Sequence, residues 1–289
     1  MAASQEHLKL DFDLDEALEV AVQAARGAGE IIKTTFRTGI KDEMKTETDP
    51  VTATDYACEE LVLKAVKAKF PSHEFLGEET HHGGGKQEEG YNLTDAPTWV
   101  CDPVDGTANF LHGVAWTCVS IALVVNKQSV LGVVYNPILD ELYTGVRGRG
   151  ARLNGQVITG SDQKMLSKAM VCTEFGANRD PQVLSLKLSV VGKVTAAPVQ
   201  AVRCLGSAAL NMCSVACGRM DAYYEWGMHA WDVAGASVIC DEAGVTLSDL
   251  DGSEFGICDR RVLVASKGIH TSLCDLLVAA GVPPIGHQG

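Results

Sequence analysis

The stretch TWVCDPVDGTANF, from Thr98 to Phe110, joins an apolar run to a pair of aspartates. Residues 98–101 are β-branched, aromatic or apolar, which predicts a short buried strand. Proline fixes its own φ and lacks a backbone N–H, so Pro103 is expected to end that strand and turn the chain. Asp102 and Asp105 would then gather at the end of the strand, where their charges need a partner.

The composition indicates a globular protein. The chain has 289 residues, of which 46% are hydrophobic and 21% charged, and its formal net charge is −13. This balance gives a large core, and it favours neither nucleic-acid binding nor a membrane span. The N-terminal stretch MAASQEHLKLDFDLDEALEV has no basic segment followed by an apolar core, so a cytoplasmic location is expected. The 10 cysteines include no CxxC pair, which favours reduced, buried thiols.

Hydrophobic periodicity predicts an α/β chain with a prominent antiparallel sheet. Asp13 and Glu16 are expected to cap the first helix, and a second helix runs from near Asp55 to before Pro71. Residues 116–158 have the pattern of a β-meander that contains an Asn-Gly hairpin turn. Further helices are expected near residues 181–192, 207–217, 231–242 and 270–280.

The chain shows no internal repeat or low-complexity linker. The polar, glycine-rich segment 80–97 predicts an exposed loop, and the only plausible seam lies near residues 159–162. We therefore expect one compact unit of two halves. Residues 1–160 would carry the metal-binding motifs and the antiparallel sheet, and residues 161–289 would form a C-terminal α/β half.

Acidic residues recur at the ends of apolar elements. Glu78 and Glu79 follow FLG, Asp102 and Asp105 follow TWVC, and Asp232 lies in HAWDVAGA. Any one of these could be a helix cap or a solvated turn. If they converge, however, two carboxylates about 4 Å apart repel by about 4 kcal/mol at an effective dielectric of about 20. A hard divalent cation would relieve that repulsion, and Mg²⁺ keeps open positions for a phosphate oxygen and a water.

The residues after the two aspartates are typical of an anion site. Gly106 permits close approach of a ligand, Thr107 offers a hydroxyl, and a helix is expected to begin near Asn109. The backbone here is therefore predicted to bind the phosphate that the metal attracts.

DPVDGTANF resembles the first signature of the inositol monophosphatase family, and WDVAGASVICDEAG resembles its second. PVTATD, FLGEET and GARLNG support the resemblance, which covers roughly residues 14–277; HAWD and DAYYEWGMH are most similar to the animal-type enzymes. The resemblance implies a layered αβαβα sandwich and Mg²⁺-dependent hydrolysis of small phosphate monoesters.

The resemblance also implies oxygen ligands for two Mg²⁺ ions and a weaker, mostly hydrated third. The first ion would be held by Glu78, Asp102 and the carbonyl of Val104, the second by Asp102, Asp105 and Asp232, and the third would lie near Glu78 and Glu79.

The implied nucleophile is a metal-activated water, oriented by Glu78 and Thr107, that attacks phosphorus directly without a covalent enzyme intermediate. Asp55 would accept a hydrogen bond from the Thr107 hydroxyl. The implied substrate contacts are Gly106 and Thr107 to the phosphate, and Asp105, Gly206, Ser207, Ala208, Glu225 and Asp232 to the hydroxyl groups.

Several residues depart from the family pattern. Ala108 and Val245 lie outside the ligand set, and Ala177 replaces a serine that often lies near the substrate, which affects fine specificity. Lys45 precedes a segment that is one residue shorter than usual, so we leave Lys45 out of the predicted site.

The leading functional hypothesis is release of myo-inositol from its 1- or 4-phosphate, with a homodimer and lithium inhibition implied by the resemblance. The alternative within the class is a related small sugar-phosphate phosphatase, such as one acting on L-galactose 1-phosphate. A covalent aspartyl-phosphate mechanism would need DxDGT rather than the DxxDGT found here. A non-catalytic metal-binding protein on the same fold is a further alternative, although every acidic position is present.

Overall fold

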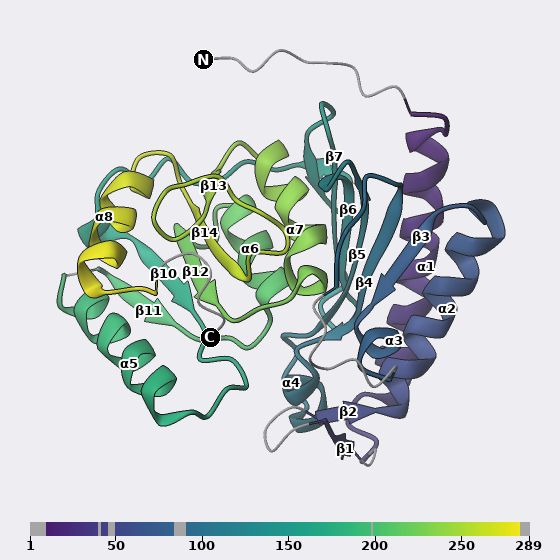
Figure 1. The fold of residues 1–289 in the computed structure, drawn as a ribbon, viewed down its shortest axis with the longest axis horizontal. Helices are drawn as coiled ribbons and strands as arrows, with labels where there is room; N and C mark the ends of the chain where they lie inside the picture. Colours follow the sequence, from purple (N-terminus) through teal and green to yellow (C-terminus); the bar gives the residue numbers. More distant parts are fainter. Residues whose placement is uncertain (1–9, 40–41, 46–49, 84–90, 198, 284–289) are drawn as a thin grey trace.

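The computed structural model describes residues 10–39, 42–45, 50–83, 91–197 and 199–283. Three helical layers alternate with two β-sheets (Figure 1). Two helices cover the outer face of the larger sheet, two lie between the sheets, and two cover the outer face of the smaller sheet. In that order they are α1 (Leu14–Thr35), α2 (Ala53–Lys69), α6 (Ala208–Ala216), α7 (Ala230–Glu242), α5 (Pro181–Ala196) and α8 (His270–Ala280). The predicted αβαβα sandwich is confirmed.

The larger sheet has the strand order β3-β4-β5-β6-β7-β8-β9, in which only the β3–β4 pair is parallel. The predicted meander is confirmed, and its Asn154-Gly155 turn has φ of 48° and 80°, as a tight hairpin requires. The strands are β3 (Glu74–Gly77), β4 (Thr98–Asp105), β5 (Cys118–Val125), β6 (Gln128–Asn136), β7 (Glu141–Val146), β8 (Ala151–Leu153) and β9 (Gln156–Val157).

The strand that carries the two aspartates differs from its prediction. β4 does not end at Pro103 but continues to Asp105, with a shift in its register against β5 between Asp102 and Asp105. A proline is tolerated there because the irregular pairing removes the need for its N–H. The following helix α4 (Thr107–His112) begins at Thr107 rather than near Asn109.

Segment 80–97 is also less loop-like than predicted. Helix α3 (Glu78–Gly83) takes up its first residues, and Leu93 is only 4% exposed because it packs in an apolar cluster with Trp231. Residues 84–90 of the predicted loop lie outside the described residues.

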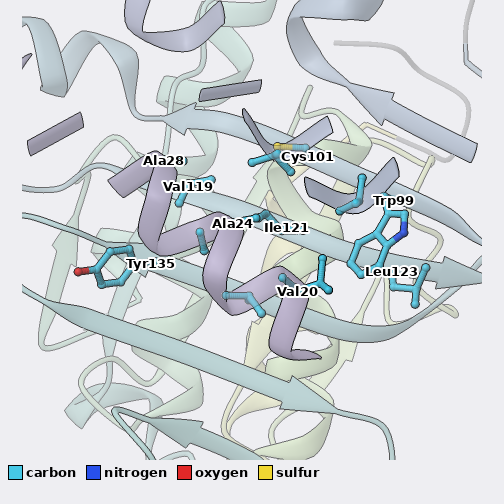
Figure 2. Close-up of a cluster of buried hydrophobic side chains, with 14 of the residues drawn as sticks. Val20, Ala24, Ala28, Trp99, Cys101, Val119, Ile121, Leu123 and Tyr135 are labelled. Atoms are coloured by element: carbon cyan, nitrogen blue, oxygen red, sulfur yellow. The ribbon is translucent and has the colours of Figure 1, made fainter. Parts of the chain in front are cut away.

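Small side chains bring the outer helix α1 close to the larger sheet. Figure 2 shows Val20, Ala24 and Ala28 of α1 facing Val119 and Ile121 of β5. The alanines are almost fully buried, and their small side chains let the helix lie near the strands. This packing holds the central strands, and hence the end of β4, in place.

Helix α7 packs closely on the opposite face of the sheet (Figure 1). A Cβ added at Gly132 of β6 would stand 2.0 Å from the carbonyl oxygen of Gly235 in α7. Only glycine therefore fits where β6 passes under the helix. The contact sets the position of Asp232 in the first turn of α7.

The smaller sheet has the order β11-β10-β12-β14-β13, with parallel pairing of β10 to both of its neighbours. Its strands are β10 (Met170–Thr173), β11 (Ala201–Arg203), β12 (Ala222–Trp226), β13 (Thr246–Ser248) and β14 (Arg261–Ala265), and a separate hairpin consists of β1 (Asp42–Met44) and β2 (Pro50–Thr52). The division of the chain into halves at residue 160 stays a prediction. Among the described residues, no helix has the length and apolar character that crossing a membrane requires.

Candidate active site

Two carboxylates at the end of β4 form the centre of the candidate site. Asp102 is 2% exposed and Asp105 is 8% exposed. Asp105 Oδ2 accepts hydrogen bonds from Ser207 Oγ at 2.6 Å and from the backbone N–H of Ala209 at 2.8 Å. The last residue of β4 is therefore joined to the start of α6, across the boundary between the two sheets.

Glu78 begins α3 directly after β3, at the same end of the larger sheet as α4 (Figure 1). Its position depends on Glu59 of α2, which is 4% exposed. The Glu59 carboxylate accepts hydrogen bonds from the backbone N–H groups of Glu79 and Thr80, each at 2.7 Å. Sequence reasoning missed Glu59, whose only signal is an acidic residue beside the buried face of a helix.

Asp232 lies in the first turn of α7. Its Oδ2 accepts a hydrogen bond of 2.7 Å from the N–H of His229, and the ring of His229 stacks on Trp231 at 4.6 Å between centroids. The next N–H, that of Ala230, donates to the hydroxyl oxygen of Tyr91 at 2.6 Å. The helix start is thus fixed by its own cap and by the segment that follows α3.

Asp55 and Thr107 meet as predicted. Asp55 Oδ2 accepts from the N–H and the hydroxyl of Thr52, at 2.9 and 2.6 Å, which closes a capping box at the start of α2. The Thr107 hydroxyl lies 3.2 Å from Asp55 Oδ1 and 2.9 Å from the Val104 carbonyl oxygen, so its single proton has two alternative acceptors. A carbonyl oxygen has two lone pairs, so Val104 retains acceptor capacity.

The acidic side chains influence one another strongly. Burial raises the pKa of Asp102 well above its usual value, and Glu78, Asp105 and Asp232 raise it further. Burial also raises the pKa of Asp105 to about 6, although Ser207 and Ala209 hydrogen-bond its carboxylate. The same cause, opposed by Thr52, raises the pKa of Asp55 to about 6. Negative charge at this site is therefore under-compensated by the protein alone.

Lys45 belongs to the site, contrary to the prediction that left it out. Its Nζ lies 2.7 Å from both Glu78 Oε1 and Glu79 Oε1, and its side chain is 7% exposed. Burial lowers the pKa of Lys45, but the two carboxylates outweigh burial and the net shift is upward. The prediction omits Lys45 because the segment after it is one residue shorter than usual. Its position, however, is set by the pairing of β1 with β2, since Lys45 directly follows β1.

The donor set fits a hard divalent cation. Its members are carboxylates and a carbonyl, and Glu79 Oε2 is buried without a hydrogen-bond partner among the described residues. Lys45 supplies one positive charge against several acidic side chains. In the part of the chain that the structure describes, no three Asp, Glu, His or Cys side chains form a closed metal cluster. The carboxylates instead share a site in which Glu78 and Asp105 raise the pKa of both Asp102 and Asp232.

Two loops from different sheets meet beside these carboxylates. Gly106 has φ of +87°, and a Cβ added to it would lie 3.0 Å from the carbonyl oxygen of Gly206. Asn109 joins the same two segments, since its Nδ2 donates to the carbonyl oxygens of Trp116 and Leu205 at 2.8 and 2.7 Å. Ser207 and the 9% exposed Ala208 follow, so the predicted segment 206–208 does lie against Asp105. Sequence reasoning missed Asn109.

Glu225 lies at the far side of this segment, on β12. Its side chain is 6% exposed and accepts a hydrogen bond from the Tyr223 hydroxyl. Neighbouring Glu174 accepts from the N–H groups of Leu205 and Gly206, at 2.6 and 2.8 Å. Glu174, which the sequence did not single out, therefore shapes the loop that carries the predicted hydroxyl contacts.

Comparison with known proteins agrees with this geometry. The sequence profile described as "Inositol monophosphatase family" matches residues 13–281. The chain is 48% identical to inositol monophosphatase 3 of Solanum lycopersicum, covering 91% of this chain and 97% of the relative. It is 43% identical to inositol monophosphatase 1 of Bos taurus, covering 87% and 90%.

The solved structure of an inositol monophosphatase from Anabaena (Nostoc) sp. PCC 7120 superposes with a TM-score of 0.80 at 34% identity, covering 94% of this chain and 98% of the other. The sequence matches and the structural superposition indicate the same family. The chain belongs to the inositol monophosphatase family and is a phosphoric monoester hydrolase.

Proposed function

We propose that this protein is a Mg²⁺-dependent phosphatase that hydrolyses myo-inositol monophosphate to inositol and phosphate, with two or three Mg²⁺ ions in each active site. The observation that carries the proposal is the shared site of Glu78, Asp102, Asp105 and Asp232, whose mutually repelling charges need a cation. Names of the relatives support the substrate, since the tomato and bovine proteins are both inositol monophosphatases.

The ligand assignment follows the oxygen atoms available. Glu78, Asp102 and the Val104 carbonyl would hold one ion, Asp102, Asp105 and Asp232 a second, and Glu78 with Glu79 would lie near a third. When bound, Mg²⁺ would neutralise these charges, polarise the phosphate and lower the pKa of an attacking water.

Asp55 and Thr107 would orient the water. An acceptor at Asp55 Oδ1, 3.2 Å away, attracts the Thr107 proton, so the lone pairs of Thr107 Oγ1 are free to accept from a water molecule. Glu78 would accept the other water proton. With water as the nucleophile, no covalent bond forms between phosphorus and the protein.

Substrate binding would use both loops. The backbone of Gly106 and Thr107 would bind phosphate oxygens, while Asp105, Glu225, Asp232 and the segment Gly206-Ser207-Ala208 would bind the polyol hydroxyls. Ser207 Oγ already donates to Asp105 at 2.6 Å, so towards a substrate its hydroxyl can only accept. Glu225 would also act as an acceptor, which suits a ligand rich in hydroxyl groups.

Phosphate release from a panel of esters tests the substrate. We expect myo-inositol 1- and 4-phosphate to be hydrolysed fastest in the presence of Mg²⁺, and EDTA to abolish turnover. Faster hydrolysis of L-galactose 1-phosphate would replace the inositol assignment with the sugar-phosphate alternative. Full activity in EDTA would contradict the metal proposal.

Two further measurements test the site and the mechanism. Asp232→Asn should reduce kcat by at least about 100-fold without unfolding the protein, whereas the matched control Asp241→Asn, on the same helix, should not. In a single turnover in ¹⁸O-water, direct attack labels the released phosphate; unlabelled phosphate would instead indicate an aspartyl-phosphate intermediate.

The proposal also includes a cytoplasmic homodimer that millimolar lithium inhibits. Light scattering of the purified protein measures its oligomeric state, and the phosphate assay with added LiCl measures inhibition by lithium. A monomer, or rates unaffected by lithium, would remove that part of the proposal.

A further inference from the structure

A lysine is buried beneath the proposed polyol site. Lys187 lies in the middle of α5 and is only 3% exposed, which is rare for a lysine. Its Nζ donates to the carbonyl oxygens of Phe175 and Trp226, at 2.9 and 3.0 Å, and lies 5.1 Å from the centroid of the Trp226 ring. Burial lowers the pKa of Lys187, and these contacts offset part of the cost of burying its ammonium group.

The same ammonium lies beside Glu225, the residue before Trp226. A Cβ added at Gly176 would be 3.4 Å from Lys187 Nζ and 3.7 Å from Glu225 Oε1, so both charged ends flank one glycine. Burial raises the pKa of Glu225 to about 7, while the charge of Lys187 opposes that rise. The nearby acids, Glu174 and Asp105, act against ionisation of Glu225.

Lys187 also holds the turn that joins Glu225 to α7. Arg260 contacts the same turn, donating through Nε to the Met228 carbonyl at 3.0 Å and through Nη2 to the Gly227 carbonyl at 2.7 Å. Three successive carbonyl groups, those of residues 226–228, thus accept hydrogen bonds from cationic side chains. Two cationic side chains thus hold the turn, and Glu225, the residue before it, is held with it.

We propose that Lys187 is a positioning residue for polyol recognition, which holds Glu225 in place and in its ionised form so that it accepts hydrogen bonds from substrate hydroxyls. An ionised carboxylate presents only acceptors and can receive two hydroxyl protons, whereas a protonated one also presents a donor. The inference rests on the proposed function, because it needs a hydroxyl-rich substrate next to Glu225. It makes Lys187 a determinant of the preference for polyol esters over simple ones.

The test compares myo-inositol 1-phosphate with phenyl phosphate, which offers no hydroxyl to Glu225. Lys187→Met should raise KM for the inositol ester by about 10-fold, the size expected when a charged hydrogen bond to a substrate is lost. For phenyl phosphate, kcat and KM should both stay within about twofold. Lys187→Arg, which keeps charge and donors, should largely restore KM.

Lys193 supplies the matched control. It lies on the same helix and donates to a carbonyl, that of Ala280 at 3.0 Å, far along α5 from Glu225. Lys193→Met should leave KM for both esters unchanged. If Lys187→Met does not fold, Lys187→Gln takes its place, since glutamine keeps a donor for the carbonyls but carries no charge, and it should raise KM for inositol 1-phosphate alone.

A double substitution separates positioning from general damage. Because Lys187 acts through Glu225, Lys187→Met added to Glu225→Gln should raise KM no further than Glu225→Gln alone. An unchanged KM in Lys187→Met, equal losses on both esters, or additive effects in the double variant would each overturn the inference. A wild-type enzyme that does not prefer inositol 1-phosphate over phenyl phosphate would instead refute the proposed function, and the inference with it.

Discussion

Replacing Asp55 by asparagine should separate catalysis from stability. Asp55 is 1% exposed, with one oxygen bonded to Thr52 and the other facing the Thr107 hydroxyl. Asparagine has the same shape, but only one of its two polar ends is an acceptor. If the carbonyl keeps the capping bond to Thr52, the amide faces Thr107 and donates to it. The amide would then occupy one of the two Thr107 lone pairs that are proposed to orient water.

Replacing Asp55 by asparagine has two opposing effects on the free energy of unfolding, which are similar in size. Burial raises the pKa of Asp55 from 3.8 to about 6, so the ionised form at pH 8 is disfavoured in the folded state by about 3 kcal/mol. This term already includes the Thr52 hydrogen bonds to the carboxylate. Asparagine removes it, but the amide that replaces Oδ1 can no longer accept a hydrogen bond from Thr107, at a cost of about 1–2 kcal/mol. We therefore expect the free energy of unfolding to change by less than about 2 kcal/mol, while kcat falls by about 100-fold or more.

The pH dependence has a definite sign. Because the folded pKa of Asp55 lies above the unfolded one, its contribution to stability is present below about pH 4 and is lost as the pH rises to about 6. The free energy of unfolding of Asp55→Asn, relative to that of the wild type, should consequently be more favourable at pH 8 than at pH 5.

Urea unfolding at both pH values and steady-state kinetics with myo-inositol 1-phosphate measure these effects. Asp180→Asn is the matched control, because Asp180 caps α5 from an exposed position outside the site. It should leave kcat unchanged. A kcat for Asp55→Asn within threefold of the wild type, or a loss of stability above about 3 kcal/mol at pH 8, would refute the reasoning.

Three other predictions concern stability. Gly132→Ala should lower the free energy of unfolding by at least about 2 kcal/mol in urea, because its Cβ would stand 2.0 Å from the Gly235 carbonyl oxygen; an unchanged midpoint would contradict the packing of α7. Arg261→Met should cost about 3 kcal/mol or more, since it leaves Asp249 buried without its ion-pair partner, and adding Asp249→Leu should recover part of that loss. Burial raises the pKa of Glu225 to about 7, so between about pH 4.5 and 7 the metal-free protein should lose stability as the pH rises; a melting temperature in EDTA that increases from pH 5 to pH 8 would count against this.

Much of the fold could be predicted from local patterns. The helices from residue 181 onward and the meander follow from hydrophobic periodicity and turn residues, which act over a few residues. The errors lie where tertiary pairing overrides a local rule. Pro103 breaks a regular strand, yet β4 continues through it because β5 pairs on both sides of the irregularity.

Residues that hold the site together were harder to predict than those in its motifs. Glu59, Asn109 and Glu174 use their polar atoms on backbone groups of other segments, and no spacing in the sequence reveals which segments those are. Lys45 shows the same limit in a different form. Its place beside Glu78 depends on how β1 pairs with β2, and a comparison of segment lengths does not contain that information.

The site lies at the junction of the two sheets, where tertiary packing brings its acids together. Ionised carboxylates from β4, α3 and α7 repel one another there, so the packing of these elements has to overcome that repulsion. Asp105 illustrates the result, because the hydrogen bonds that oppose its protonation come from Ser207 and Ala209 at the start of α6. Loosening the contact between the sheets would therefore raise the pKa of Asp105 and weaken metal binding together. A substitution at this boundary, such as Ser207→Ala, should weaken Mg²⁺ binding measured by calorimetry even though Ser207 is not a proposed ligand.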